Sequence, residues 1–190
     1  MRLIVGLGNP GAEYSQTRHN FGFMALDDYV AGHGGVWHYK AKFLADVAEL
    51  IINGSKVLFA KPQTFYNLTG ESVQRIRSFY KIELSDMLII HDEMALPLGI
   101  IRTRLGGSDA GNNGIKNMIA TNGAEFARVR VGSGVTPTAN GDAQPTNGRR
   151  NYVLGHLTVD EQKILKDKLN IVDQIITQFI NGEFVETTYR

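Results

Sequence analysis

Short apolar stretches recur along the chain, and polar or glycine-containing segments separate them. Several of these stretches are rich in β-branched residues and are bounded by Gly, Pro, Asn or Asp, which predicts β-strands. They are Leu3–Leu7, Leu44–Ile52, Val57–Ala60, Met87–His91 and Val129–Val131. Between them, apolar residues at spacings of three and four predict amphipathic helices, namely Phe21–Val30, Val73–Tyr80 and Ile115–Ile119. This mixture of strands and helices predicts an α/β fold.

Local signals at two places refine this picture. Thr158 and Glu161 form a capping-box pattern that begins a last helix, and Gly182 is placed to end it. Asn53-Gly54 separates two strand-like runs, which predicts an antiparallel hairpin and therefore a mixed sheet. Neither a repeat nor a linker divides the chain. We therefore predict one domain over residues 1–190, with a twisted mixed sheet flanked by helices and a C-terminal helix.

Composition narrows the class of protein. The chain is 43% hydrophobic and 21% charged, as expected of a soluble globular protein. Its first residues form one short apolar run without a cleavage site, far from the ~20 apolar residues that a membrane span needs. There is no cysteine, which excludes disulfides, thiolate nucleophiles and zinc–thiolate sites. We expect a protein of the cytoplasm, neither exported nor bound to a membrane.

The net charge of +1 does not indicate a protein that binds nucleic acid through bulk electrostatics. Contact with RNA would require a local basic patch, and basic residues do gather in the middle of the chain. They are Arg102, Arg104, Lys116, Arg128, Arg130, Arg149 and Arg150. A solvated face is the alternative interpretation of this cluster. The segment Thr136–Arg150, rich in Gly, Pro, Asn and Thr, predicts a surface loop.

The segment Gly6–Gly11 has the spacing G-x-G-x-x-G of a dinucleotide-binding loop. In such a loop the glycines lead directly into a helix, and an acidic residue ends a second strand. Here Pro10 removes a backbone donor, no helical pattern begins before Phe21, and Asp27 and Asp28 fall inside the predicted helix. A tight turn is therefore favoured over a nicotinamide site.

Two further kinds of catalytic site find little support. Gly106–Ala110 lacks the final glycine of a serine nucleophile elbow. The chain has no H-E-x-x-H motif, and the consecutive His91, Asp92 and Glu93 would point to alternate sides of a strand. We therefore predict neither a serine triad nor a metal site, and no cofactor.

The remaining candidates are suited to activating water. His19 lies in a polar loop, and Asp92 follows the predicted strand Met87–His91. If that strand is a parallel neighbour of the first strand, the two loops share one edge of the sheet. A neutral histidine can accept a proton from water, and a carboxylate on its other nitrogen orients the ring and stabilises the imidazolium. Asparagine amides nearby could bind substrate or an oxyanion, although asparagine is also a common turn residue; the candidates are Asn9, Asn67 and Asn113.

Several segments together resemble the bacterial peptidyl-tRNA hydrolases. Gly6–Gly11, Glu13-Tyr14 and Thr17–Gly22 resemble the N-terminal signature of that family, and the likeness extends to about residue 157. It continues in Lys61–Gly70 (KPQTFYNLTG), His91–Gly99 (HDEMALPLG), Gly106–Lys116 (GGSDAGNNGIK) and Arg128–Gly132 (RVRVG).

The resemblance implies a metal-independent enzyme that cleaves the ester bond of peptidyl-tRNA and recycles tRNA from stalled translation. It implies that His19 is the general base and Asp92 its orienting partner. By position, Asn9 and Asn67 are expected to contact the peptide and the terminal adenosine region, and Asn113 to hold a water molecule or the peptide backbone. Tyr14 and Phe65 are expected to line that channel. Arg104 and Arg130 are expected to bind tRNA phosphate. We also expect a monomer, because no long apolar seam is left over.

The chain departs from the family pattern at three places. Asn112 stands where histidine is usual, Tyr66 stands where methionine is usual, and Ser108–Ala110 alters the glycine-rich segment. Asp109 adds a negative charge near the expected tRNA path, which predicts weaker tRNA binding. A catalytically silent RNA-binding relative is the main alternative, and a nucleotide-dependent oxidoreductase is a third hypothesis. The silent relative predicts loss of His19 or Asp92, and both are present.

Overall fold

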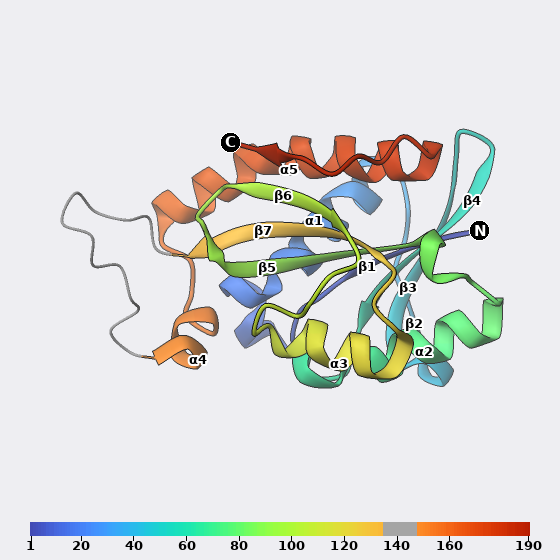
Figure 1. The fold of residues 1–190 in the computed structure, drawn as a ribbon, viewed down its shortest axis with the longest axis horizontal. Helices are drawn as coiled ribbons and strands as arrows, with labels where there is room; N and C mark the ends of the chain where they lie inside the picture. Colours follow the sequence, from blue (N-terminus) through green and yellow to red (C-terminus); the bar gives the residue numbers. More distant parts are fainter. Residues whose placement is uncertain (135–147) are drawn as a thin grey trace.

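The computed structural model describes residues 1–134 and 148–190, and the side chains of residues 148–150 are not included. Eight strands form one sheet in the order β2-β3-β4-β1-β5-β7-β6-β8 (Figure 1). The strands are β1 (Arg2–Gly6), β2 (His38–Lys40), β3 (Ala45–Ile52), β4 (Ser55–Pro62), β5 (Met87–Pro97), β6 (Ile101–Leu105), β7 (Ala127–Gly134) and β8 (Thr188–Tyr189). The helices are α1 (Phe21–Gly32), α2 (Thr69–Tyr80), α3 (Asn113–Asn122), α4 (Gly148–Val153) and α5 (Val159–Asn181).

The sheet is mixed, as predicted. The central strands β4, β1, β5 and β7 are parallel, while β2, β3, β6 and β8 pair antiparallel with their neighbours. Asn53 and Gly54 join β3 to β4 with φ of 48° and 76°, the backbone that a two-residue type I′ hairpin requires. The predicted hairpin is therefore confirmed.

Helices cover both faces of the sheet. Figure 1 shows α5 along one side of the strands and α2 and α3 along the other. Alternate residues of each central strand enter the two cores: Ile4 and Ile90 pack with α1 and α5, whereas Val5 and Ile89 pack with α2 and α3. Each fully buried aliphatic side chain contributes about 1.5–3 kcal/mol, so these two apolar layers fix the strands in place.

The predicted helices are confirmed, with longer bounds. The capping box at the start of α5 is present, because Glu161 donates its backbone N–H to Thr158 and accepts the backbone N–H of Thr158 in return. Gly182 ends the helix with φ of 81°. The loop predicted over Thr136–Arg150 lies outside the described residues as far as Asn147, and its last three positions belong to α4 instead.

Three strands and part of a fourth were not predicted. β2 and β8 are only three and two residues long and lie at the two edges of the sheet, so they carry no apolar pattern of their own. β6 alternates buried Ile101 and Thr103 with arginines over five residues. β5 continues to Pro97, so Asp92 lies within the strand and not after it. That residues 1–190 form a single domain stays a prediction.

Candidate active site

The loop after β1 and the middle of β5 meet at one edge of the parallel part of the sheet. β1 and β5 are parallel neighbours, and Gly6 pairs with Ile90 in the last position of their register. β1 ends there, while β5 continues. His91, Asp92 and Glu93 therefore lie beside the loop that follows β1 instead of beside another β1 residue.

His19 is carried to this edge by the short 3-10 helix Arg18–Asn20, which runs directly into α1. The first turn of α1 lies against the strand backbone at Gly22. A Cβ atom on Gly22 would lie 2.5 Å from the carbonyl oxygen of Ile90 and from the backbone nitrogen of Leu7. Only glycine allows this approach, and the approach brings His19 within reach of β5.

Arg18 secures the same 3-10 helix from the other side. Its guanidinium donates to both carboxylate oxygens of Glu161, at 2.5 and 2.6 Å, and to the carbonyl oxygens of Tyr152, Gly155 and His156. Arginine is suited to such a site, because its planar group offers several donors in fixed directions. The position of His19 is thus coupled to α4 and α5.

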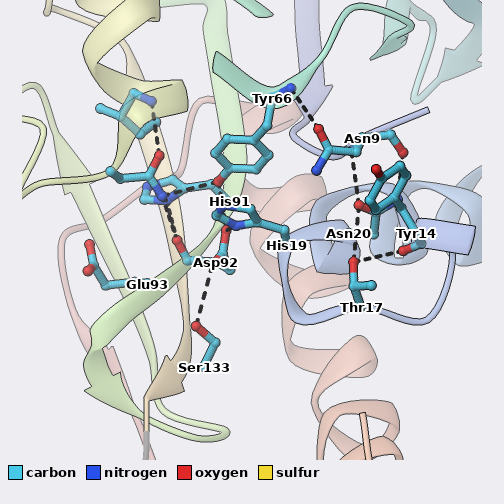
Figure 2. Close-up of polar contacts among 12 residues, drawn as sticks. Asn9, Tyr14, Thr17, His19, Asn20, Tyr66, His91, Asp92, Glu93 and Ser133 are labelled. Carbon is cyan, nitrogen blue, oxygen red and sulfur yellow. Dashed lines mark hydrogen bonds and ion pairs between the residues drawn. The ribbon is translucent and has the colours of Figure 1, made fainter. Parts of the chain in front are cut away.

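His19 and Asp92 form a hydrogen-bonded pair. The imidazole Nδ1 lies 2.8 Å from the Asp92 Oδ1 (Figure 2). The His19 side chain is 18% exposed, whereas that of Asp92 is 1% exposed. When Asp92 is ionised, Nδ1 is the donor, and Nε2 keeps its lone pair. Nε2 makes no hydrogen bond to any residue that the structure describes, so it is free to take a proton.

Asp92 is ionised at neutral pH. Burial alone would raise its pKa, but the neighbouring imidazole and the hydrogen bonds from His19 and Tyr66 outweigh burial and lower the pKa below its ordinary value. The Tyr66 hydroxyl donates to the same Oδ1 at 2.7 Å. The Tyr66 ring stacks on the imidazole, with centroids 3.9 Å apart and planes 11° apart.

Asn9 is held rigidly beside this pair. Its backbone N–H donates to Asn20 Oδ1, and its carbonyl accepts from Asn20 Nδ2, both at 2.9 Å. Its side-chain Oδ1 accepts the backbone N–H of Tyr66, also at 2.9 Å. This hydrogen bond fixes the orientation of the amide, and Nδ2 has no hydrogen-bond partner among the described residues. Asn9 thus presents a fixed, neutral amide NH2 that can donate.

The other predicted peptide-contacting residues lie on elements that border the pair. Asn67 lies in the 3-10 helix Tyr66–Leu68, and Phe65 is the residue before that helix; both are exposed. Tyr14, on the 3-10 helix Ala12–Tyr14, is half-buried. Asn113 is the exposed first residue of α3. Asn67, Asn113 and Tyr14 make no side-chain hydrogen bond within the described residues, so their amide and hydroxyl groups are available to a ligand, while Phe65 exposes an apolar ring.

Arg104 and Arg130 lie on the paired strands β6 and β7. Successive side chains of a strand point to opposite faces of the sheet. Arg102, Arg104, Arg128 and Arg130 therefore share one face, opposite the face that packs on α1 and α5. Arg130 Nη2 lies 2.9 Å from Glu93 Oε2. Arg128 is buried and donates to the carbonyl oxygens of Gly107 and Ser108, so its role is to hold that loop.

Three residues at the site were not predicted from the sequence to have a functional role. Asn20 fixes Asn9, and its only signal was its place beside His19. Tyr66 and Asn112 were noted only as departures from a family pattern. Asn112 caps α3 through Oδ1 and donates from Nδ2 to the Tyr66 hydroxyl and to the Asp92 carbonyl. Nothing in the local sequence around either residue indicates this contact.

Within the described ranges no group of three His, Asp or Glu side chains is arranged to hold a metal ion. Nor does any helix in those ranges have the length and apolarity to cross a membrane. The glycine loop Gly6–Gly11 leads into a 3-10 helix, and Asp27 and Asp28 lie on α1, so the context of a dinucleotide site is missing.

An α/β sheet that brings a histidine–carboxylate pair to the edge of its parallel strands, with one imidazole nitrogen unbonded among the described residues, fits the class of hydrolytic enzymes. Comparison with known proteins gives the particular family. The model of the peptidyl-tRNA hydrolase family matches residues 3–190. The chain belongs to the peptidyl-tRNA hydrolase family, and it is a hydrolase that acts on peptidyl-tRNA.

Individual relatives agree with this assignment. A peptidyl-tRNA hydrolase of Bacillus cytotoxicus is 39% identical over 98% of this chain and 96% of its own. One of Clostridium acetobutylicum is 42% identical over 93% and 89%. The crystal structure of peptidyl-tRNA hydrolase from Acinetobacter baumannii superimposes with a TM-score of 0.87 at 32% identity, over 96% of this chain and 90% of that chain. The predicted resemblance is therefore confirmed, and it extends beyond residue 157 to the C-terminus.

Proposed function

We propose that His19 is the general base by which this enzyme cleaves the ester bond between peptide and tRNA, without a metal ion. One observation carries the proposal: Nδ1 of His19 is held by buried Asp92 at 2.8 Å, while Nε2 has no hydrogen-bond partner in the part of the chain that the structure describes. Nε2 takes a proton from a water molecule as its oxygen attacks the ester carbonyl carbon. Asp92 stabilises the imidazolium that forms.

Return of the proton from His19 completes the reaction. Collapse of the tetrahedral intermediate breaks the bond to the ribose oxygen, and the imidazolium returns its proton to that oxygen. The products are a peptide with a free carboxyl group and a tRNA with a free terminal hydroxyl. His19 ends in its neutral form, so the cycle balances and consumes only water.

Neutral amides select the substrate in this proposal. Asn9 and Asn113 contact the peptide backbone, and Asn67, Tyr14 and Phe65 line the channel for the peptide and the terminal adenosine. Asn9 supports this assignment, because the hydrogen bond from the Tyr66 backbone to its Oδ1 fixes the amide and leaves Nδ2 able to donate to a carbonyl oxygen. Fixed neutral groups of this kind leave the ammonium of a free aminoacyl-tRNA without a partner, so that substrate is rejected.

Arg104 and Arg130 bind tRNA phosphates. Their place on one face of β6 and β7 supports this role, since a short basic surface can hold a phosphate backbone even when the whole chain is nearly neutral. We further propose that the enzyme is a cytoplasmic monomer that recycles tRNA from aborted translation.

The test is a comparison of two tRNA substrates with purified, folded protein, with and without a chelator. N-acetyl-aminoacyl-tRNA is expected to be cleaved at the same rate in both conditions, and free aminoacyl-tRNA is expected to remain intact. Asn9→Ala is expected to raise KM for the blocked substrate. Folded protein that binds tRNA without cleaving either substrate would establish the silent RNA-binding alternative, and loss of cleavage with the chelator would refute the metal-independent mechanism.

A further inference from the structure

The side chain of Tyr66 lies against His19 and Asp92 (Figure 2), and its hydroxyl also contacts Asn112. It is 4% exposed. Its hydroxyl lies 2.7 Å from Asp92 Oδ1 and 3.1 Å from Asn112 Nδ2. Its ring is parallel to the imidazole, at 3.9 Å between centroids. One buried side chain thus contacts the base through its ring and the partner of the base through its hydroxyl.

The direction of these hydrogen bonds follows from the helix cap. Asn112 Oδ1 accepts the backbone N–H of Ile115, so the amide group of Asn112 must turn Nδ2 toward Tyr66. Nδ2 can only donate. The Tyr66 oxygen therefore accepts from Asn112, and its hydrogen is directed to Asp92. The cap of α3 thus fixes the direction of both hydrogen bonds, from Asn112 to Tyr66 and from Tyr66 to the Asp92 carboxylate.

We propose that Tyr66 is a positioning residue for the His19–Asp92 pair, and that its hydroxyl sets the pH range in which His19 is an active base. This inference rests on the proposed function, in which His19 accepts a proton. Asp92 Oδ1 receives two donors, the Tyr66 hydroxyl and His19 Nδ1. The hydroxyl donor stabilises part of the carboxylate charge that would otherwise stabilise the imidazolium of His19.

Tyr66 stays protonated and can keep this role. Burial, and then the negative charge of Asp92, raise the pKa of the Tyr66 hydroxyl well above its ordinary value. Among residues 1–134 and 148–190, the second oxygen of Asp92 has only the Ser133 hydroxyl, at 3.5 Å, within hydrogen-bond distance. The Tyr66 hydroxyl is thus the main donor to Asp92 besides the histidine itself.

The ring has a separate effect. Stacking holds the imidazole plane while its Nδ1 hydrogen bond fixes its rotation, so Nε2 points in one direction. Gly114, on the first turn of α3, also packs against the Tyr66 ring, and a Cβ atom there would overlap the ring. The tyrosine ring is therefore fixed between α3 and His19.

Other ionisable groups face the pair but do not depend on the tyrosine hydroxyl. On β5 they are His91, which acts on Asp92, and Glu93, which acts on Tyr66; on β7, Arg128 acts on His91 and Arg130 on Glu93. Glu93 is paired with Arg130, and Arg128 is bonded to backbone carbonyls. Tyr66→Phe removes only the hydroxyl and keeps the ring, so it isolates the hydroxyl from these charges.

The experiment measures kcat and KM for N-acetyl-aminoacyl-tRNA from pH 5 to 9 in wild type, Tyr66→Phe and Tyr66→Leu. In Tyr66→Phe we expect the acid limb of the kcat/KM profile to move up by about half to one pH unit, with KM unchanged and a rate near that of wild type at high pH. In Tyr66→Leu, which loses the stacked ring as well, we expect kcat to fall at every pH.

A second readout needs no substrate. The titration midpoint of the His19 ring, followed by NMR, is expected to rise in Tyr66→Phe by the same amount. A folded Tyr66→Phe whose pH profile and His19 midpoint both match wild type would overturn the proposal, because tyrosine would then only fill space. Failure of the proposed function would be distinct: His19→Ala would retain its rate, while the NMR midpoint would still report the effect of Tyr66.

Discussion

The Asp92 carboxylate and the His19 imidazole are joined at 2.8 Å, although 73 positions separate them in the chain. Two independent constraints produce this contact. The parallel pairing of β1 with β5 brings the loop after β1 beside Asp92. The close packing of Gly22 on the strand backbone then sets the height of His19 above the sheet.

Replacement of Asp92 by asparagine tests the orienting role of the carboxylate. Asp92→Asn keeps the shape but removes the charge that stabilises the imidazolium and selects the Nδ1–H tautomer. We expect kcat to fall about a hundredfold or more, with KM within about threefold of wild type. Steady-state kinetics on N-acetyl-aminoacyl-tRNA give both values. If kcat/KM fell about a hundredfold through a rise in KM alone, with kcat unchanged, this role would be contradicted.

The salt dependence of tRNA binding tests the two arginines. Arg104→Ala is expected to reduce the slope of log Kd against log salt by about 1, as loss of one phosphate contact does. A smaller change is expected for Arg130→Ala, because Glu93 at 2.9 Å already compensates part of its charge. Lys166→Ala, on the opposite face of the sheet, is the control. Equal slopes for Arg104→Ala and wild type would exclude Arg104 from the interface.

Removal of the Asp109 charge is predicted to raise the affinity for tRNA. Its Oδ1 accepts the backbone N–H of Gly111, so Asp109→Asn can keep the loop in place while it removes the charge. We expect tighter tRNA binding in this variant at low salt, and a difference that shrinks as salt is raised, because repulsion of phosphate is screened. Fluorescence titration with tRNA measures both. Unchanged affinity at low salt would show that Asp109 lies outside the tRNA path.

Asp173 on α5 gives a prediction for stability. Burial, and then the nearby negative charge of Asp28, raise the pKa of Asp173 to about 6. The folded protein therefore favours the protonated acid, and the charged form costs stability as pH rises from the unfolded value of 3.8 toward 6 and remains costly above it. Asp173→Asn removes this cost.

We expect Asp173→Asn to be more stable than wild type above pH 6 by on the order of 1 kcal/mol, less than a full shift would give, because water screens the partly exposed side chain. Below pH 4 the difference is expected to vanish. Urea unfolding at pH 4 and pH 7.5 measures it. The same difference at both values would mean that packing, not charge, distinguishes the variant from wild type.

Hydrophobic periodicity was sufficient to predict the elements that bury a face. The central parallel strands and the long helix α5 were predicted because alternate or three-to-four spacings of apolar residues reflect the two cores directly. β2 and β8 could not be predicted, since an edge strand of two or three residues is defined by the strand it pairs with and not by its own side chains.

Only part of the site could be predicted from the sequence. His19 and Asp92 could be paired from sequence because a histidine and an acid next to parallel strands point to one edge. Tyr66 could not, because an aromatic residue next to a helix start is indistinguishable from a core residue. Its contacts with Asp92 and Asn112 join three elements that are remote in sequence, and only the fold brings them together.

The rate of ester cleavage in His19→Ala is the most direct test of the account. It is measured in single turnover on N-acetyl-aminoacyl-tRNA at saturating, folded enzyme, with His38→Ala on the exposed edge strand β2 as the matched histidine control. We predict a loss of about a hundredfold or more for His19→Ala and a rate near wild type for His38→Ala. A His19→Ala rate within about threefold of wild type would contradict the assignment of His19 as the base.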